Sequence, residues 1–296
     1  MHTYKGMRAV WWLILLAAIT VLGSGLLQVY MMESGMREYQ AMSLAQLLLI
    51  VPVLAGVVYL RLYNYESVGS LMGFRAFEPA MVFVLLVLPV ATQYAASLVQ
   101  MPITNRLVEL FGQQTDMTCP KKVTDFLWLF VALCVVAPVM EELFFRGVIY
   151  KALEPYGMAV SILVSAFSFS LLHFQPTVFV CIFIVGIVLG FVRVYSGSVF
   201  ACILFHSVFN FESLLQIVFG KVLSTVPLYM GVYVLIMLCL FPVLCLIGYL
   251  CWGRGKSYKA MSSVGLHGIV PMLLCMVLYG IMSAMLVMQN RIGGGF

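Results

Sequence analysis

The chain has 296 residues, of which 64% are hydrophobic and only 9% are charged, and its mean hydropathy is +1.09. A soluble domain carries roughly 25% charged residues, so this composition excludes a protein whose whole surface faces water. The net charge of +5 fits contact with anionic lipid headgroups, and the basic residues are not interleaved with aromatic residues as they are in nucleic-acid-binding proteins.

Apolar blocks, each about 20 residues or longer, follow one another along the chain, and a helix of that length crosses a hydrocarbon core of about 30 Å. The blocks show no alternation of apolar and polar residues, which excludes a transmembrane β-barrel. The sequence therefore predicts an all-α fold: a polytopic bundle of transmembrane helices that forms a single membrane domain over residues 1–296.

We expect nine spans. Eight is the alternative count, because only short breaks, at residues 175–176 and 196–197, separate the fifth, sixth and seventh blocks. The first block follows Lys5 and Arg8 and is too long for the apolar region of a signal peptide, so we expect a retained anchor. In chain order, the expected spans are residues 9–32, 41–60, 80–100, 125–150, 158–174, 177–195, 197–219, 227–251 and 268–289.

The distribution of lysine and arginine over the loops predicts a cytoplasmic N-terminus. Cytoplasmic loops carry an excess of these residues, and the cluster Arg254, Lys256 and Lys259 contributes most to the bias. With the N-terminus inside, the cytoplasmic set is Lys5, Arg8, Arg61, Arg75, Lys151, Arg193, Arg254, Lys256 and Lys259, and the outer set is Arg37, Arg106, Lys121, Lys122, Lys221 and Arg291.

A small set of charged and strongly polar residues lies inside the expected spans. Each costs about 2.5–3.5 kcal/mol at the bilayer centre, so each needs a partner or a function. Arg193 and Lys151 lie near span ends, where we expect their side chains to extend to the cytoplasmic interface. The polar set within the spans is Glu141, Glu142, Arg146, His173, Arg193, His206, Asn210 and Glu212.

Two members of this set are expected to pair along their own helix. Glu142 and Arg146 are four residues apart and share a helix face, whereas Glu141 points about 100° away from Glu142. The pair supplies its own counter-ion and leaves the Glu141 carboxylate unpaired. An unpaired carboxylate in an apolar cavity can exchange a proton near neutral pH, as a general base requires.

The same four-residue spacing recurs in two further spans. It places His173 one turn after Phe169, and Asn210 one turn after His206. If the fourth, fifth and seventh spans meet, these two polar faces and Glu141 would enclose one small water-filled cavity. Such a set can polarise a water molecule and donate hydrogen bonds to an oxyanion, which is the equipment for hydrolysing an amide.

A structural role is the alternative for each of these residues taken alone. An intramembrane His or Asn forms a hydrogen bond between helices more often than it forms a catalytic site. Gly186 and Gly190 form a small-xxx-small pair that indicates close helix packing. The eight cysteines include no CxxC pair and are interpreted as small buried hydrophobic residues.

Three motifs occur in order along the chain: EExxxR at residues 141–146, FxxxH at residues 169–173 and HxxxN at residues 206–210. This ordered set resembles the CPBP family of intramembrane proteases, also called Abi, which joins CAAX prenyl endopeptidases with bacteriocin-processing and self-immunity proteins. Residues 186–210 also resemble the family's third and fourth motif region. The resemblance covers about residues 125–215, which are the expected catalytic core helices.

The resemblance implies a role for each motif residue. Glu141 would activate the attacking water, and His173 would help to hold it. His206 and Asn210 would stabilise the tetrahedral oxyanion. The remaining polar members of the first motif, Glu142 and Arg146, would shape the site.

A second account of the same family treats the Glu and His residues as metal ligands. Glu141, His173 and His206 would form a legitimate zinc shell with an open position for water. The absence of an HExxH pair, which pre-forms a zinc grip on one helix, favours the metal-free mechanism. The sequence leaves both possibilities open: no cofactor, or one divalent metal with zinc as the first candidate.

Other intramembrane proteases are excluded because the chain has no HExxH, no GxGD and no GxSG followed by a helical His. We therefore expect a multi-pass intramembrane endopeptidase of a bacterial plasma membrane that cleaves a membrane-associated peptide or protein tail. Candidate substrates are a prenylated CAAX tail, a signalling or bacteriocin peptide precursor and a membrane-protein tail. The competing functions are a proton-coupled transporter, in which Glu141, His173 and His206 relay protons, and a scaffold without catalytic activity.

Overall fold

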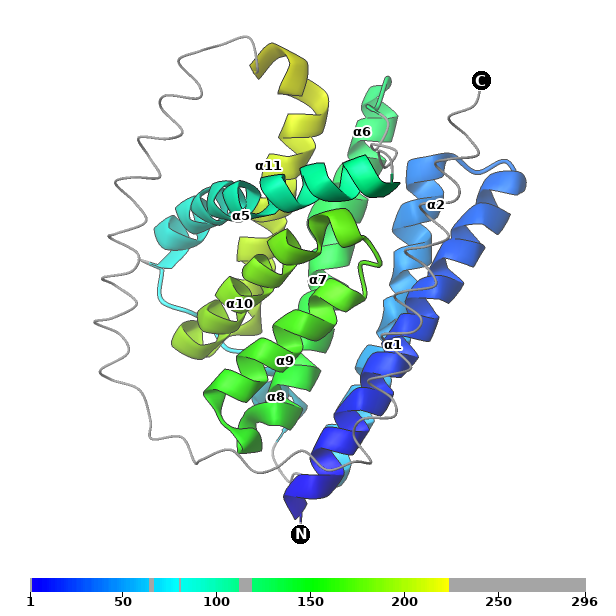
Figure 1. Ribbon diagram of the computed structural model, residues 1–296. Helices are drawn as coiled ribbons and strands as arrows, with labels where there is room; N and C mark the ends of the chain where they lie inside the picture. Colours follow the sequence, from blue (N-terminus) through cyan, green and yellow to red (C-terminus); the bar gives the residue numbers. More distant parts are fainter. Residues whose placement is uncertain (1, 64–66, 80, 112–118, 224–296) are drawn as a thin grey trace.

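The computed structural model describes residues 2–63, 67–79, 81–111 and 119–223 (Figure 1). Within these ranges every regular element is a helix, which confirms the all-α class. The last two expected spans, 227–251 and 268–289, lie outside the described residues.

The first helices form a long antiparallel pair at one side of the bundle (Figure 1). After α1, the chain reverses at Gly35, whose φ of 92° is readily adopted only by glycine. The returning arm is interrupted by one 3₁₀ turn, η1, and a short helix follows it. The elements are α1 (His2–Glu33), α2 (Glu38–Ala45), η1 (Gln46–Leu49), α3 (Ile50–Tyr63) and α4 (Val68–Met72).

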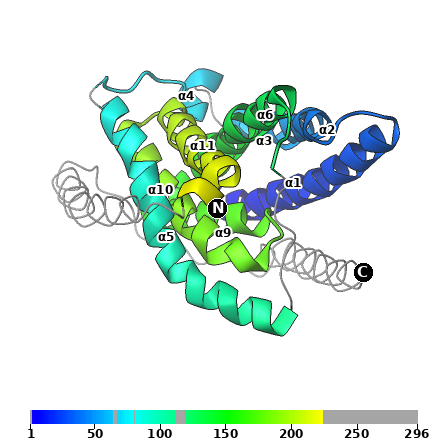
Figure 2. The same cartoon turned by 90° about the horizontal axis from the view of Figure 1, so that it is seen from above.

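Helix α5 (Met81–Phe111) is bent and packs against α10 and α11, with its axis running across them (Figure 2). Its direction changes by 44° between the halves Met81–Ser97 and Val99–Glu109. Pro102 has no backbone N–H, and its ring crowds the carbonyl four residues earlier, which is the position of the bend.

Residues 123–156 form one helical rod of 34 residues. The short α-helical segment α7 in its middle carries Glu141 and Glu142, and the segments on either side, η2 and η3, are π-helical. A π-helix is rare; it occurs mostly as a single turn inside an α-helix and is frequent at functional sites. The segments in order are α6 (Val123–Phe130), η2 (Val131–Val136), α7 (Ala137–Glu142), η3 (Leu143–Ile149), α8 (Tyr150–Leu153) and η4 (Glu154–Tyr156).

Three further helices complete the described fold, and glycines allow the tight turns before the first and before the last of them. Gly157, with φ of 100°, precedes α9, and Gly197, with φ of 64°, separates α10 from α11. The elements are α9 (Met158–Leu171), η5 (Pro176–Val178), α10 (Phe179–Ser196) and α11 (Val199–Leu223).

Five helices of the described residues are long and apolar enough to cross a membrane, and α5 adds a sixth if its two halves form one span. The sequence predicted seven spans in this part of the chain. The difference lies in the bent α5 and in the expected span 158–174. That span is the 14-residue α9, which extends about 21 Å and is shorter than a hydrocarbon core of about 30 Å. The total of nine spans and the cytoplasmic N-terminus stay predictions.

Close packing of α9 on α10 positions the polar face of α9. A Cβ atom at Gly186 would lie 2.9 Å from Ala166 Cα, and a Cβ atom at Gly190 would lie 2.8 Å from the Ile162 side chain. Both distances are shorter than real Cβ contacts, so only glycine permits this approach. The expected role of the small-xxx-small pair is confirmed, and it brings α9 against η3 of the rod.

Two apolar clusters lie among the helices, one including the rod and one beside it. One cluster joins α1, α3, α9 and η3 and includes the buried side chains of Ile14 and Val148. Another joins α5, α10 and α11 and includes Leu85 and Leu189. Arg146, the one polar side chain of η3, is fully buried and must find its hydrogen-bond partners inside the protein.

Candidate active site

The two π-helical segments determine which way the glutamate pair of α7 faces. In η2 the N–H of Ala137 donates to the carbonyl of Ala132, and in η3 the N–H of Tyr150 donates to the carbonyl of Phe145. Each bond spans five residues, so each π turn rotates the following residues relative to an α-helix. The direction of α7 side chains is consequently set on both sides of the pair.

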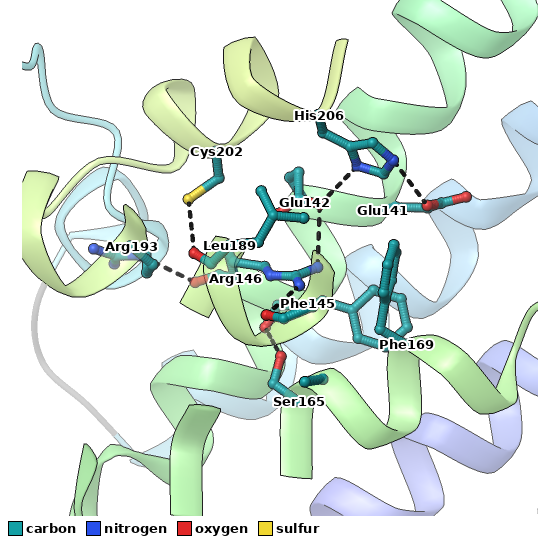
Figure 3. A network of polar contacts seen from close by, with 12 residues as sticks. Glu141, Glu142, Phe145, Arg146, Ser165, Phe169, Leu189, Arg193, Cys202 and His206 are labelled. Atoms are coloured by element: carbon teal, nitrogen blue, oxygen red, sulfur yellow. Dashed lines mark hydrogen bonds and ion pairs between the residues drawn. The ribbon is translucent and has the colours of Figure 1, made fainter. Parts of the chain in front are cut away.

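Glu142 and Arg146 form a fully buried ion pair (Figure 3). Arg146 Nη1 donates to Glu142 Oε1 at 3.1 Å, and Arg146 Nη2 donates to the carbonyl of Gly186 on α10 at 3.1 Å. Both side chains have 0% exposure. The pairing predicted from the four-residue spacing is confirmed, and it also ties the rod to α10.

The Phe169 ring touches three functional side chains at once, two of which, Arg146 and His206, are labelled with it in Figure 3. Its centroid lies 4.7 Å from Arg146 Cζ, a cation–π contact. The same ring meets the His173 ring edge to face at 4.8 Å and the His206 ring at 5.6 Å. Phe169 is itself buried, with 2% exposure. One phenyl ring thus fixes the separation of the guanidinium and the two imidazoles.

His206 lies between the two carboxylates of α7 (Figure 3). Its Nδ1 lies 2.8 Å from Glu142 Oε1, and its Nε2 lies 3.9 Å from Glu141 Oε2. An ionised carboxylate can only accept a hydrogen bond, so Nδ1 carries the hydrogen and Nε2 faces Glu141. Sequence reasoning missed the contact between His206 and Glu142, because spacing along one helix does not reveal which residue of another helix faces it.

Glu141 is the more accessible of the two carboxylates, with 20% of its side chain exposed. A separation of 3.9 Å from His206 Nε2 is too long for a direct hydrogen bond. Two atoms at that separation can both contact one water molecule at about 2.8 Å each. The pair therefore offers a position where a water molecule touches a carboxylate and an imidazole together.

His173 is oriented by its own helix. Its Nδ1 lies 2.8 Å from the carbonyl of Phe169, and a carbonyl only accepts, so Nδ1 carries the hydrogen and Nε2 is the acceptor. The side chain is half-buried. His173 shares the Phe169 ring with His206, which places the two imidazoles on the same aromatic group.

Asn210 bonds to the rod rather than to another side chain of the predicted set. Its Nδ2 donates to the carbonyl of Leu133 in η2 at 2.7 Å. This is the hydrogen bond between helices that was the structural alternative for such a residue. The amide nitrogen has a second hydrogen, so Asn210 can hold Leu133 and still donate elsewhere.

The structure joins four of the predicted site residues in one continuous set of contacts, and the other two are attached to it less directly. Phe169 links His173 to His206, and the Leu133 carbonyl links Asn210 to the rod. The four directly connected residues are Glu141, Glu142, Arg146 and His206.

The Arg193 side chain does not extend out of the protein, as was expected of it. Its side chain is buried, with 9% exposure, and its Nε donates to the carbonyl of Arg146 at 3.1 Å. A buried guanidinium N–H needs an acceptor inside the protein, and this carbonyl is one. Lys151, which was expected to reach the interface, pairs with the exposed Glu154 at 2.7 Å.

A metal ion would need a different arrangement of ligands. Among the residues that the structure describes, no group of three His, Cys, Asp or Glu side chains is placed to hold one. A catalytic zinc needs three protein ligands. Glu141 and His206 are adjacent, but His173 does not join them as a third ligand in this arrangement.

The chain matches a known protein family. A family model described as type II CAAX prenyl endopeptidase, Rce1-like, matches residues 123–211. The match begins at the first residue of α6 and ends just after Asn210, so it includes the whole site. Comparison with curated proteins and with solved structures gave no significant match. Through residues 123–211, this integral membrane protein matches the CAAX protease family, the family that its three motifs resemble.

Proposed function

We propose that the protein is an intramembrane endopeptidase that hydrolyses a peptide bond in a membrane-associated peptide or protein tail, with a water molecule activated by Glu141. The observation that carries the proposal is the His206 imidazole held between two carboxylates, 2.8 Å from Glu142 and 3.9 Å from Glu141. One carboxylate is buried and paired and the other is accessible, which is the division between an orienting group and a reacting group.

Glu141 is the proposed general base. Apart from His206, no cationic side chain of the described residues forms an ion pair with it. It takes a proton from a water molecule between its Oε2 and His206 Nε2. In its doubly protonated form His206 donates Nε2–H to the oxygen of that water, and His173 helps to hold the water. The hydroxide oxygen forms a bond to the scissile carbonyl carbon, and the C=O π electrons move onto the carbonyl oxygen.

The resulting oxyanion needs hydrogen-bond donors. His206 supplies one from Nε2 when it holds a second proton, and the Glu142 carboxylate at Nδ1 is the counter-ion for that form. The second hydrogen of Asn210 Nδ2 supplies another. Removing one such donor typically lowers kcat by about 10²–10³-fold.

Collapse of the tetrahedral intermediate completes the reaction. The carbonyl re-forms, the C–N bond breaks, and its electron pair stays on the nitrogen. The nitrogen takes the proton that Glu141 removed from water. The hydroxyl group of the water stays on the acyl carbon and its proton leaves on the amine, so every atom is accounted for and Glu141 returns to its starting form.

A prenylated CAAX tail is the first substrate class to test, because the matching family is described as CAAX prenyl endopeptidases. Purified protein in lipid nanodiscs is incubated with a farnesylated peptide that ends in a CAAX sequence, and fragments are measured by mass spectrometry. We expect cleavage by the unaltered protein and a loss of about 10²–10⁴-fold in Glu141→Gln. The unfolding temperature of the variant should not fall.

A matched control is Glu154→Gln. Glu154 lies on the same rod, but its carboxylate pairs with Lys151 outside the site. This variant should cleave at the unaltered rate. Retained cleavage in Glu141→Gln would contradict the proposed base. Uptake of the peptide by proteoliposomes without cleavage would favour the transporter. Binding of the peptide with neither uptake nor cleavage would favour the scaffold. The same peptide without the prenyl group shows whether the lipid is required.

A further inference from the structure

In each π-helical segment of the rod, one carbonyl accepts a hydrogen bond from a side chain of another helix. In η2 the N–H of Ala137 donates to Ala132, and Pro138 has no N–H to donate. Neither usual donor therefore serves the carbonyl of Leu133, and Asn210 bonds to it at 2.7 Å. A buried carbonyl left without such a partner would be costly.

The same arrangement occurs on the other side of the glutamate pair. The N–H of Tyr150 is four residues after Arg146, but it donates to the carbonyl of Phe145. The carbonyl of Arg146 instead accepts from Arg193 Nε on α10 at 3.1 Å (Figure 3). Arg193 therefore occupies, at η3, the place that Asn210 occupies at η2.

Arg193 is a buried cation whose neighbours include an aromatic ring but no paired carboxylate among the described residues. Its Cζ lies 5.6 Å from the centroid of the Tyr150 ring. None of the ion pairs among the described residues involves it. Burying a cation without a carboxylate partner is unfavourable, so stability alone does not account for arginine at this position.

The loop after α4 closes over the Arg193 guanidinium. Gly73 has φ of 75°, and a Cβ atom there would overlap the guanidinium. The carbonyl of Gly73 accepts from the N–H of Val199 at 3.0 Å, and Ser198 Oγ donates to the carbonyl of Arg75. The guanidinium thus lies between the rod, this loop and the turn from α10 to α11.

We propose that Arg193 is a positioning residue: by holding the Arg146 carbonyl it fixes the π turn that directs the Arg146 side chain to Glu142, and through Glu142 it sets the orientation of His206. This inference rests on the proposed function for its effect on cleavage, but its effect on η3 does not depend on cleavage. A misplacement of about 1 Å in a catalytic group can cost about 10²-fold in rate.

The test uses the full-length protein in nanodiscs with three variants. Arg193→Met removes the donor and the charge, Arg193→Lys keeps both, and Arg75→Met removes an exposed cation of the neighbouring loop. We measure kcat and KM with the farnesylated peptide and backbone hydrogen exchange of residues 143–151. Arg193→Met should lower kcat by about 10–10²-fold with little change in KM and speed exchange in residues 143–151. Arg193→Lys should restore most of both, and Arg75→Met should change neither.

The two measurements separate this inference from the proposed function. If the unaltered protein cleaves no peptide, the proposed function fails, and hydrogen exchange in Arg193→Met still decides the role of Arg193. Unchanged exchange and unchanged kcat in Arg193→Met would overturn the inference. Faster exchange spread evenly over all helices, with a smaller folded fraction and normal kcat per folded molecule, would also overturn it, because that result describes a residue needed only for folding.

Discussion

The two neighbouring carboxylates of α7 face regions of different character. On one side, which we call the closed side, Glu142 has 0% exposure and contacts both Arg146 and His206. On the other, the open side, Glu141 keeps 20% of its side chain exposed and its nearest ionisable partner is 3.9 Å away. Adjacent residues of one helix therefore have different surroundings, because successive side chains point about 100° apart.

The different surroundings of Glu142 and Glu141 show how a helical bundle can hold a reactive carboxylate in a defined place. The closed side supplies a rigid set of charged hydrogen bonds, and those bonds fix His206 by its Nδ1. The open side supplies an acceptor that is not already neutralised. Variants that alter one side and spare the other test whether the division is real.

The largest effect is expected on the closed side. Glu142→Ala leaves the buried Arg146 cation without its counter-ion, so the free energy of unfolding should fall by about 3–5 kcal/mol. Reversible unfolding of the purified protein in mixed micelles measures this change. Glu141→Gln, in contrast, should unfold like the unaltered protein although it does not cleave.

A double variant gives the control for the buried pair. Glu142→Ala combined with Arg146→Met removes both charges, so it should regain more than half of the stability that Glu142→Ala loses. A double variant as unstable as the sum of its two single variants would show that the two side chains do not depend on each other, which would contradict the closed side as described.

His206 bridges the two sides, and two conservative variants divide its functions. Asparagine at this position places an amide N–H near the site of Nδ1, whereas glutamine places one near the site of Nε2. We expect His206→Asn to keep its bond to Glu142 and lose cleavage by about 10²–10³-fold. His206→Gln should lose about 1–3 kcal/mol of unfolding free energy, because Glu142 Oε1 loses one of its two donors and keeps only Arg146. If His206→Asn lost stability and His206→Gln lost only cleavage, the roles assigned to Nδ1 and Nε2 would be reversed.

A smaller effect is expected where Asn210 holds η2. Asn210→Ala should lower the unfolding free energy by about 1–2 kcal/mol, since the Leu133 carbonyl is left without a donor. Pro138→Ala supplies a backbone N–H that can donate to the Leu133 carbonyl. In a Pro138→Ala background, Asn210→Ala should therefore lower the unfolding free energy by less. Equal costs in both backgrounds would contradict the explanation of how the π turn is satisfied.

Sequence alone predicted the parts of the site that lie on one helix. The Glu142–Arg146 pair follows from a spacing of four residues, and the close approach of α9 and α10 follows from Gly186 and Gly190. It did not predict the contact from His206 to Glu142, or the burial of Arg193. Contacts between helices depend on how each helix is rotated, and no pattern within a single segment contains that information.

The fold was predicted in class but not in detail. Continuous apolar residues identify α-helices in a membrane, yet they do not distinguish a full span from a short buried helix such as α9. The two π segments were also not predicted, although Pro138 was a usable signal, because a proline within a helix removes one backbone donor. These segments are the features that aim the glutamate pair.

The smallest effect is expected from removing metal ions. Treatment with a strong chelator should leave the cleavage rate unchanged, because Glu141 and His206 lie together without a third ligand of the kind that zinc requires among the residues the structure describes. Elemental analysis of the purified protein accompanies the assay. Stoichiometric zinc in the unaltered protein that is lost in His173→Ala, together with inhibition by the chelator, would replace the glutamate mechanism with a metal-dependent one. The open side would then be a ligand site, whereas the closed side would keep its role of orienting His206 by Nδ1.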